Sequence, residues 1–421
     1  LGLEVATTYY FRVGSVGHDG RANYLAAAST KTLLTEVPPG NPRPDGVFLS
    51  SVTLAWTPVN ADLGYLVEAS TAADFSGVLR STSPAAKSAS AAPLTALDSN
   101  TTWYFRVASV WVSTTKYAAA FSTPTLAAAV SGLAYKEVFR TSATVSWLPL
   151  PASPSSSTAE GYLLEASSTG FSGGAVVSSM TRVVGLSTLS LSGLNVHATY
   201  QFRVGSLNWR DMRHYAVLPD TPTLPSPPGQ GSPPLSAVAV TSLSASWDAG
   251  FPGNPAGTRY ELRAGAVSSA TLNLGGDLVG LVANTTYTVS VRVLSHGGQA
   301  VETVLGTTVT LAAAPGAPAV SAISSTSLTV SWSTAASRGY RLEASSTNFA
   351  SGTLYSSATP NGSLGTLTVS GLDPNTTQYL RVAALNWNSH PNYAAVASTI
   401  TLAPALTGLE QAGVFETSAT V

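Results

Sequence analysis

The sequence predicts an all-β protein built as a tandem array of small β-sandwiches. A strand ending in tryptophan, such as Ser51-Val-Thr-Leu-Ala-Trp56, occurs four times, and each copy is followed by a second strand of the form Gly64-Tyr-Leu-Val-Glu68. Leucines that open a third shared motif recur at spacings of 94, 97, 87 and 91 residues. Self-similarity at a fixed period is typical of repeat architectures, and short strands between turn residues indicate sandwiches.

The repeat divides the chain into four complete modules and two partial ones. These are the C-terminal part of a module at 1–35, the first module at 36–126, the second at 127–224, a divergent third at 225–312, the fourth at 313–402, and the N-terminal strands of a further module at 403–421. The two end segments match opposite halves of a module, which favours a window from a longer polypeptide. The alternative is that a neighbouring chain supplies the missing strands.

The third shared motif places an aromatic residue on the buried face of a late strand. In order, the motif has a leucine, five variable residues, an aromatic residue, one variable residue, an apolar residue, one variable residue and a valine. Period-two alternation puts the aromatic residue and the valine on one face of the strand. The position is that of a tyrosine corner, in which the hydroxyl is tied back to the preceding turn. Its occupants are Tyr9, Trp103, Tyr200 and Tyr287, with Gln378 in the fourth module.

An early tryptophan strand, a tyrosine on the next strand and this corner motif together resemble the fibronectin type III family. The resemblance covers the whole chain and implies an immunoglobulin-like sandwich of seven strands in every complete module. It also implies that the strand tryptophans pack in the cores: Trp56, Trp147, Trp247 and Trp332. Trp103 and Gln378 depart from the family's tyrosine, which puts the corner hydrogen bond of their modules in question.

Composition argues against several classes of function. The chain has no cysteine, a net charge of −1 and only 10% charged residues, against about 25% in typical soluble domains. A nucleic-acid partner is not expected, because such proteins show a clustered basic face. No apolar run is long enough to insert in a membrane. The five histidines and the scattered carboxylates show no metal-ligand or catalytic spacing, so we expect no enzyme activity, metal or cofactor.

Asn-x-Ser/Thr sequons recur at one position. Three of them fall in the turn before the corner strand, and a fourth lies elsewhere in the fourth module; they are Asn100, Asn284, Asn375 and Asn361. One interpretation is N-glycosylation of an exposed turn. The other is that Asn and Thr suit the turn, because their side chains hydrogen-bond to nearby backbone.

Aromatic residues after the corner strand are the candidate interaction residues of the chain. A Leu-Asn-Trp loop occurs twice, and a tyrosine follows at a nearly fixed distance in four repeats. The set is Trp111, Trp209, Trp387, Tyr24, Tyr117, Tyr215 and Tyr393. Trp and Tyr on loops serve protein interfaces and sugar-stacking faces alike. Packing of the tryptophan on the sandwich end, and of the tyrosine on the neighbouring module, is the structural alternative.

Three functions are consistent with these features. The first is a structural segment of a long extracellular or cell-surface protein that associates with copies of itself into a fibre, filament or sheath. The second is an adhesin array that binds surface glycans or a protein receptor through the Trp loops. The third is a spacer in a secreted polysaccharide-degrading enzyme. Phrases such as Glu165-Ala-Ser-Ser-Thr169 resemble repeats of very long bacterial surface proteins, so a bacterial source is expected.

Overall fold

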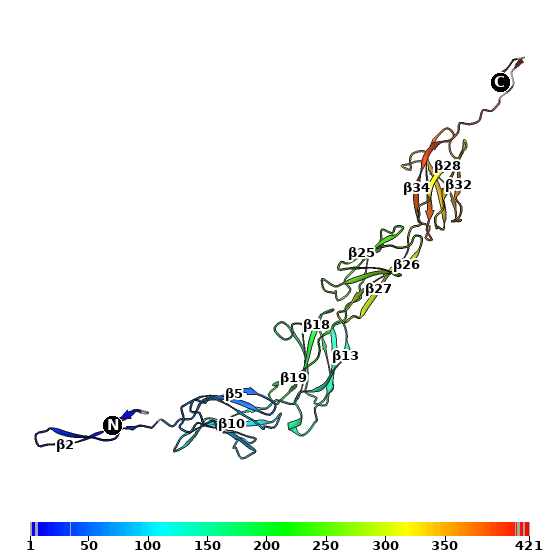
Figure 1. The fold of residues 1–421 in the computed structure, drawn as a ribbon. Coiled ribbons are helices and arrows are strands. Elements are labelled where there is room, and N and C mark those ends of the chain that lie inside the picture. The colour runs from blue at the N-terminus through cyan, green and yellow to red at the C-terminus, as the bar shows by residue number, and fades with distance from the viewer. Residues whose placement is uncertain are drawn as a thin grey trace. The chain divides into compact units, whose positions relative to one another are not determined.

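The computed structural model describes residues 2–4, 7–33, 35–408, 410, 413–415 and 417–420. Within these ranges the regular elements are β-strands, apart from one 3₁₀ turn at Ser155–Ser157 (Figure 1). The chain divides into two compact units. The first comprises Leu1–Leu194 and Thr199–Thr221, and the second comprises Asn195–Ala198 and Pro222–Val421.

The first unit contains the N-terminal partial module and the first complete module. In the partial module β1 pairs with β4 and β2 with β3; the bounds are β1 Thr8–Tyr9, β2 Arg12–Val16, β3 Ala22–Ala26 and β4 Thr30–Lys31. The first module has the sheets β5-β6-β9 and β11-β10-β7-β8, with β12 also paired to β10. Its bounds are β5 Gly40–Val47, β6 Val52–Thr57, β7 Tyr65–Ser70, β8 Leu79–Thr82, β9 Ala91–Leu94, β10 Thr102–Val110, β11 Thr115–Tyr117 and β12 Phe121–Pro124.

The second module completes the first unit. Its sheets are β13-β14-β17 and β16-β15-β18-β19, with β20 also paired to β18. The bounds are β13 Ser131–Val138, β14 Ser142–Leu148, β15 Gly161–Ser167, β16 Val176–Thr181, β17 Thr188–Ser192, β18 Thr199–Leu207, β19 Arg213–Val217 and β20 Thr221–Pro222.

The second unit contains the third and fourth modules. The third has the sheets β21-β22-β25 and β24-β23-β26-β27, and the fourth has β28-β29-β32 and β31-β30-β33-β34. The bounds in the third are β21 Gln230–Ser236, β22 Ser242–Trp247, β23 Tyr260–Ala264, β24 Val267–Thr271, β25 Gly275–Val279, β26 Thr286–Leu294 and β27 Ala300–Val309. Those in the fourth are β28 Gly316–Ile323, β29 Ser327–Ser333, β30 Gly339–Ser345, β31 Tyr355–Thr359, β32 Thr366–Ser370, β33 Thr377–Leu385 and β34 Pro391–Ile400; β35 Gly413–Phe415 and β36 Ser418–Thr420 follow as a pair.

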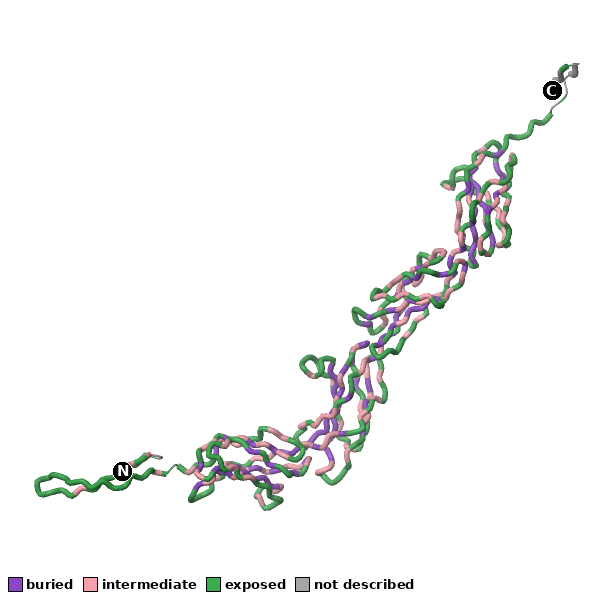
Figure 2. Tube along the Cα trace, in the orientation of Figure 1, coloured by how far each residue is buried: buried purple, intermediate pink, exposed green. Residues whose placement is uncertain are grey.

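All four complete modules therefore share one plan, a three-stranded antiparallel sheet packed on a larger one, which has five strands in the first and second modules and four in the third and fourth. Each strand presents alternate residues to the space between the sheets, as in β14, where Ala143, Val145 and Trp147 are buried and the intervening residues are not. The predicted all-β array of immunoglobulin-like sandwiches is confirmed. In Figure 2 every complete module contains buried stretches of chain.

A tryptophan–tyrosine pair occupies the core of every complete module. Trp56, Trp147, Trp247 and Trp332 are 3–7% exposed. Each indole contacts the tyrosine of the following strand, with ring centroids 5.1–5.8 Å apart. Tilted aromatic pairs of this kind add about 1 kcal/mol beyond the area they bury. The tryptophans therefore lie in the cores, where the family resemblance placed them.

The corner position differs between modules. Trp103 and Tyr200 are buried, whereas Tyr9 and Tyr287 are half-buried. The hydroxyls of Tyr9 and Tyr287 accept hydrogen bonds from the backbone N–H groups of Glu4 (2.7 Å) and Val282 (2.9 Å).

The two substituted corners reach different outcomes. The indole N–H of Trp103 donates to the Asp98 carbonyl at 3.4 Å. The corner side chain is therefore still hydrogen-bonded to the turn, but as the donor instead of the acceptor. Gln378 is fully buried, and its amide nitrogen and oxygen have no hydrogen-bond partner. The corner bond of the fourth module is therefore lost.

Candidate functional site

The loop after the corner strand is built around one asparagine. Asn208 follows β18 and is fully buried. Its Oδ1 accepts hydrogen bonds from the backbone N–H groups of Arg210 (3.0 Å) and Met212 (2.9 Å). Asn386 follows β33 and makes the same two bonds, to Asn388 (3.0 Å) and His390 (2.8 Å). Because the side-chain carbonyl oxygen bonds within the turn, the side-chain N–H₂ group can donate to residues outside the loop.

That N–H₂ group clasps the end of the preceding module. In the first unit Asn208 Nδ2 donates to the carbonyls of Thr125 (2.9 Å) and Pro124 (3.4 Å). In the second unit Asn386 Nδ2 donates to those of Val309 (3.1 Å) and Thr310 (3.2 Å). These are buried carbonyls at strand ends, and each one left unpaired would cost about 1–3 kcal/mol. The loop therefore joins consecutive modules.

The tryptophan beside the asparagine contacts the turn of the preceding module. The Trp209 indole N–H donates to the Asn100 carbonyl at 3.1 Å, and the Trp387 backbone N–H donates to Asn284 Oδ1 at 2.9 Å. Asn100 in turn donates from Nδ2 to Glu160 at 3.1 Å. Both indoles nevertheless remain 58% and 57% exposed. We call the contact of an Asn-Trp loop with the preceding turn asparagine and strand-end carbonyls the junction clasp.

The sequons divide according to these contacts. Asn100 is fully buried and Asn284 is 7% exposed. The Asn284 side chain takes part in its clasp through Oδ1, whereas Asn100 joins its clasp through its backbone carbonyl. The Asn100 side chain donates to the Ser155 carbonyl (3.2 Å) and to Glu160. Asn361 and Asn375 are exposed. At the first two positions the structure argues against glycosylation, because a glycan on a buried amide would displace the next module. The hydrogen bonds of these two side chains go to the following module rather than to their own turn.

The third module carries a different loop. Ser295 and His296 stand where the second module has Asn208 and Trp209, and Ser295 closes the same turn with its N–H to the Gln299 carbonyl. Within the second unit, which includes the turn Asn195–Ala198, His197 stacks on His296 with ring centroids 4.4 Å apart. Burial, and then the charge of His296, lower the pKa of His197.

The tyrosines of the candidate set lie on the sheet rather than in the junctions. Tyr24 stacks on Arg12, Tyr117 on Arg106, Tyr215 on Arg203 and Tyr393 on Arg381, with each guanidinium 3.8–4.2 Å from the ring centre. In the first, second and fourth modules a phenylalanine covers the other side of the arginine: Phe75, Phe171 and Phe349 at 3.7–4.1 Å. The same arginines pair with Glu68, Glu165 and Glu343 at 2.7–2.8 Å.

These arginine stacks were missed by sequence reasoning. The phenylalanines adopt left-handed backbone angles, φ 60–62°, which are unusual for a bulky residue. A signal was present, because a phenylalanine stands two or three residues before a glycine in the same place in each of the three modules. Burial, followed by interactions with the glutamates, raises the pKa of Tyr215 and Tyr393.

Trp111 does not occupy an exposed loop. It is 3% exposed, belongs to the core of the first module and donates from its indole N–H to Ser109 Oγ at 2.9 Å. It stands where the second module has Asn208, so the first module lacks the clasping amide. The exposed loop tryptophans are thus Trp209 and Trp387 alone among the three that the sequence grouped together.

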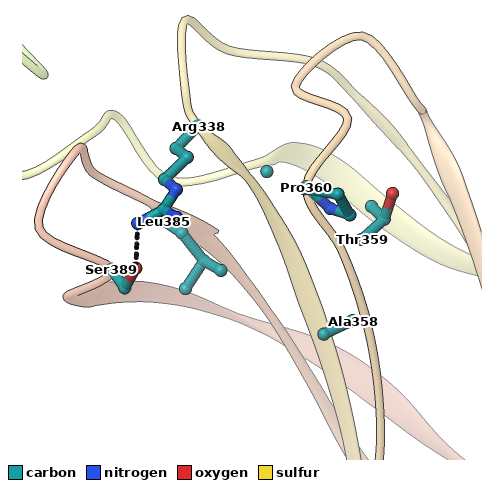
Figure 3. Close-up of a pocket in the computed structure, with 7 residues that line it drawn as sticks. Arg338, Ala358, Thr359, Pro360, Leu385 and Ser389 are labelled. Carbon is teal, nitrogen blue, oxygen red and sulfur yellow. Dashed lines mark hydrogen bonds between the residues drawn. The ribbon is translucent and has the colours of Figure 1, made fainter.

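The hollows of the molecule offer little chemistry. One in the fourth module, of about 190 Å³, is lined by Gly339, Ala358, Thr359, Pro360 and Leu385 beside Arg338, whose guanidinium donates to Ser389 Oγ at 2.7 Å (Figure 3). A hollow of about 360 Å³ lies over Phe349, Arg381 and Tyr393. In the described ranges no three His, Cys, Asp or Glu residues gather in a way that could hold a metal ion. The described residues also form no helix of the length and apolarity that a membrane crossing requires.

Comparison with known proteins identifies the class of the fourth module. Residues 313–398 match the family model of the fibronectin type III domain. A two-domain fibronectin type III segment of chicken tenascin is 16% identical, covering 43% of this chain and 98% of its own, with a TM-score of 0.27. The FN1–FN3 domains of chicken CNTN1 are 14% identical, covering 87% and 99%, with a TM-score of 0.22. No curated protein matches the chain.

Proposed function

We propose that this chain is a structural spacer of an extracellular or cell-surface protein, made stiff by junction clasps between consecutive sandwiches. Tandem fibronectin type III modules are typical of such proteins, and the family match covers the fourth module. The observation that carries the proposal is the pair of clasps: the amides of Asn208 and Asn386 each bridge two carbonyls of the preceding module. The loops expected to face a partner are used within the chain.

The composition supports the same role. With 10% charged residues and no cysteine, the chain carries little of the surface charge that prevents self-association. We propose that copies associate laterally into a fibre, filament or sheath. A nine-residue strand such as β18 spans about 30 Å at ~3.3 Å per residue, which sets the expected scale of any axial repeat.

The stiffness is tested with the double variant Asn208→Ala, Asn386→Ala. Small-angle scattering should show an increased spread of inter-module distances in both units, because each variant junction loses an amide that satisfies two buried carbonyls. Asn273→Ala, an exposed asparagine in the third module, is the matched control and should leave the curve unchanged. An unchanged curve for the double variant would remove the clasp as a source of stiffness.

The polymer proposal has its own test. Electron microscopy of native source material should show continuous fibres, tubes or a sheath with a spacing that is a multiple of the module length. Separate beads on a surface or in solution would contradict it.

An adhesin array is the second candidate, favoured by the partial exposure of Trp209 and Trp387. An indole face that remains in solvent beside the clasp can stack on a sugar ring. Glycan-array binding that disappears in Trp209→Ala plus Trp387→Ala would support this function. Binding that is absent or unaffected would exclude it for these loops.

A further inference from the structure

Four turns before the corner strand share one left-handed position. Its φ angles are 44° at Asn100, 51° at His197, 47° at Asn284 and 50° at Asn375. The turn residue and the loop of the following module vary together. Asparagine turns meet Asn-Trp loops, at Asn100 with Asn208-Trp209 and at Asn284 with Asn386-Trp387. The histidine turn meets a Ser-His loop, through the stacking of His197 on His296.

The fourth module presents the asparagine type of turn at its own far end. Asn375 is exposed, and its backbone N–H donates to the Leu402 carbonyl at 3.1 Å, as Asn100 does to Leu126 and Asn284 to Leu311 at 3.0 Å. The Thr401 hydroxyl donates to the Asp373 carbonyl at 2.6 Å, as Thr125 does to Asp98 at 2.6 Å and Thr310 to Val282 at 2.7 Å. The histidine turn makes the same two bonds, from the His197 N–H to the Leu224 carbonyl (3.3 Å) and from the Thr223 hydroxyl to the Asn195 carbonyl (2.7 Å). This end therefore has the turn geometry shared by all the junctions, and Asn375 marks it as the asparagine type.

Two apolar residues at this end are more exposed than their counterparts at the two clasped junctions. Ile400 is 56% exposed, whereas the residues in its place at the two clasped junctions, Pro124 and Val309, are buried. Leu402 is 55% exposed, whereas Leu126 and Leu311 are half-buried. In the sequence, Thr401 precedes Leu409 by eight residues, and Thr125 precedes the corresponding Leu133 by the same eight. A module that follows the fourth would thus be joined to it by the same number of residues as join the first and second modules at their clasped junction.

We propose that Asn375, Ile400 and Thr401 form a docking site for the Asn-Trp loop of a sandwich module joined directly after the fourth. The loop's asparagine amide would bridge the carbonyls of Ile400 and Thr401, and its tryptophan would contact Asn375. The inference rests on the junction role proposed above and adds a specificity to it: an asparagine turn selects an Asn-Trp loop and a histidine turn selects a Ser-His loop.

The test extends the full chain by one of its own modules. Residues 133–224 are joined after Gly408 in place of 409–421, with Met212→Leu in the added copy so that its peptides differ in mass from the native ones. Amide hydrogen exchange of the added loop is then compared with that of the same chain carrying Asn208→Ser and Trp209→His in the added copy. Exchange is read at loop amides other than those of residues 210 and 212, which lose the Asn208 Oδ1 acceptor in the Ser-His copy whether or not it docks. At these amides the Asn-Trp loop should exchange at least about tenfold more slowly than the Ser-His loop. Adding Asn375→His should reverse the order.

Three results decide the matter. Equal exchange of the two added loops, with the native Asn208 loop still protected, overturns this inference and leaves the proposed function standing. An unprotected native loop overturns the proposed function itself. A doubled mass of the unextended chain in light scattering, lost on Asn375→Ala, assigns the site to a second copy and also overturns the tandem occupant.

Discussion

The second and third modules share a core and differ in almost everything built on it. Both place a tryptophan against a tyrosine, Trp147 with Tyr162 at 5.2 Å and Trp247 with Tyr260 at 5.8 Å. In the second module Arg203 lies between two aromatic rings and pairs with Glu165. The third module has a corresponding ion pair, between Arg292 and Glu261 at 2.5 Å. Compared with the pair in the second module, it is shifted by two residues along each of the two paired strands.

The difference teaches which features the sandwich requires. In the described part of the third module no aromatic ring is recorded over Arg292, yet its two sheets keep the order found elsewhere. The face of the four-stranded sheet is therefore free to vary, while the space between the sheets is not. The junction loop varies as well, but together with the turn that it meets.

The largest expected effect is on the shared core. Trp147→Ala and Trp247→Ala should each destabilise their own module by about 3–5 kcal/mol, because the space of a buried indole is left as a cavity. Native-state hydrogen exchange of β14 and β22 measures this module by module. Comparable losses are expected in the two modules. A loss in one and not in the other would contradict the shared core.

The arginine stack should separate the modules. Arg203→Ala removes an ion pair and two ring contacts worth about 0.5–1 kcal/mol each, and should cost about 2 kcal/mol in total. Arg292→Ala removes an ion pair alone and should cost about 1 kcal/mol or less. Hydrogen exchange of β15 and β23 reports the two losses. Equal costs would show that the rings contribute nothing.

The junction loops provide a smaller contrast. Asn208→Ala should cost about 1–3 kcal/mol of coupling between the first and second modules, since the buried Thr125 carbonyl loses its donor at 2.9 Å and the 3.4 Å contact with Pro124 adds little. Ser295→Ala in the third module should cost about 1 kcal/mol or less, because the hydroxyl of this buried serine accepts one hydrogen bond, from the Gln299 N–H at 3.1 Å, and that bond lies within the loop. Calorimetric unfolding of the two variants measures the two losses of stability, and a larger loss for Ser295→Ala than for Asn208→Ala would contradict this prediction.

The smallest effect is a pH dependence confined to the second unit. The pKa of folded His197 is lowered by burial and by His296, whereas the unfolded residue keeps a pKa of about 6.5. The unfolded state then binds a proton that the folded state does not, so stability is complete above about pH 6.5 and falls as the pH drops below it. The protection factor of the turn Asn195–Ala198, which corrects the exchange rate for its intrinsic pH dependence, should fall from pH 7.5 to 5.5. In His197→Asn that fall should shrink; an unchanged fall would exclude the histidine as its source.

The sequence by itself determined the repeat, the strand types and the core. Period-two alternation and the recurring Trp and Tyr positions are local, because a strand's two faces differ from one residue to the next. The corner bond of Tyr287 and the burial of Trp147 followed from such patterns. The loss of the bond at Gln378 was visible as a substitution.

The tertiary structure alone decided where the loop aromatics go. Trp209 reaches Asn100 across 109 residues of chain, and Trp387 reaches Asn284 across 103, so no local pattern records either contact. Trp111 is also a tryptophan, but it stands one position earlier in its loop than Trp209 and Trp387 do in theirs, and it is buried. The position of a side chain at a loop tip thus depends on the polar groups that the neighbouring sandwich presents to it, since buried carbonyls and amides must find hydrogen-bond partners wherever the fold places them.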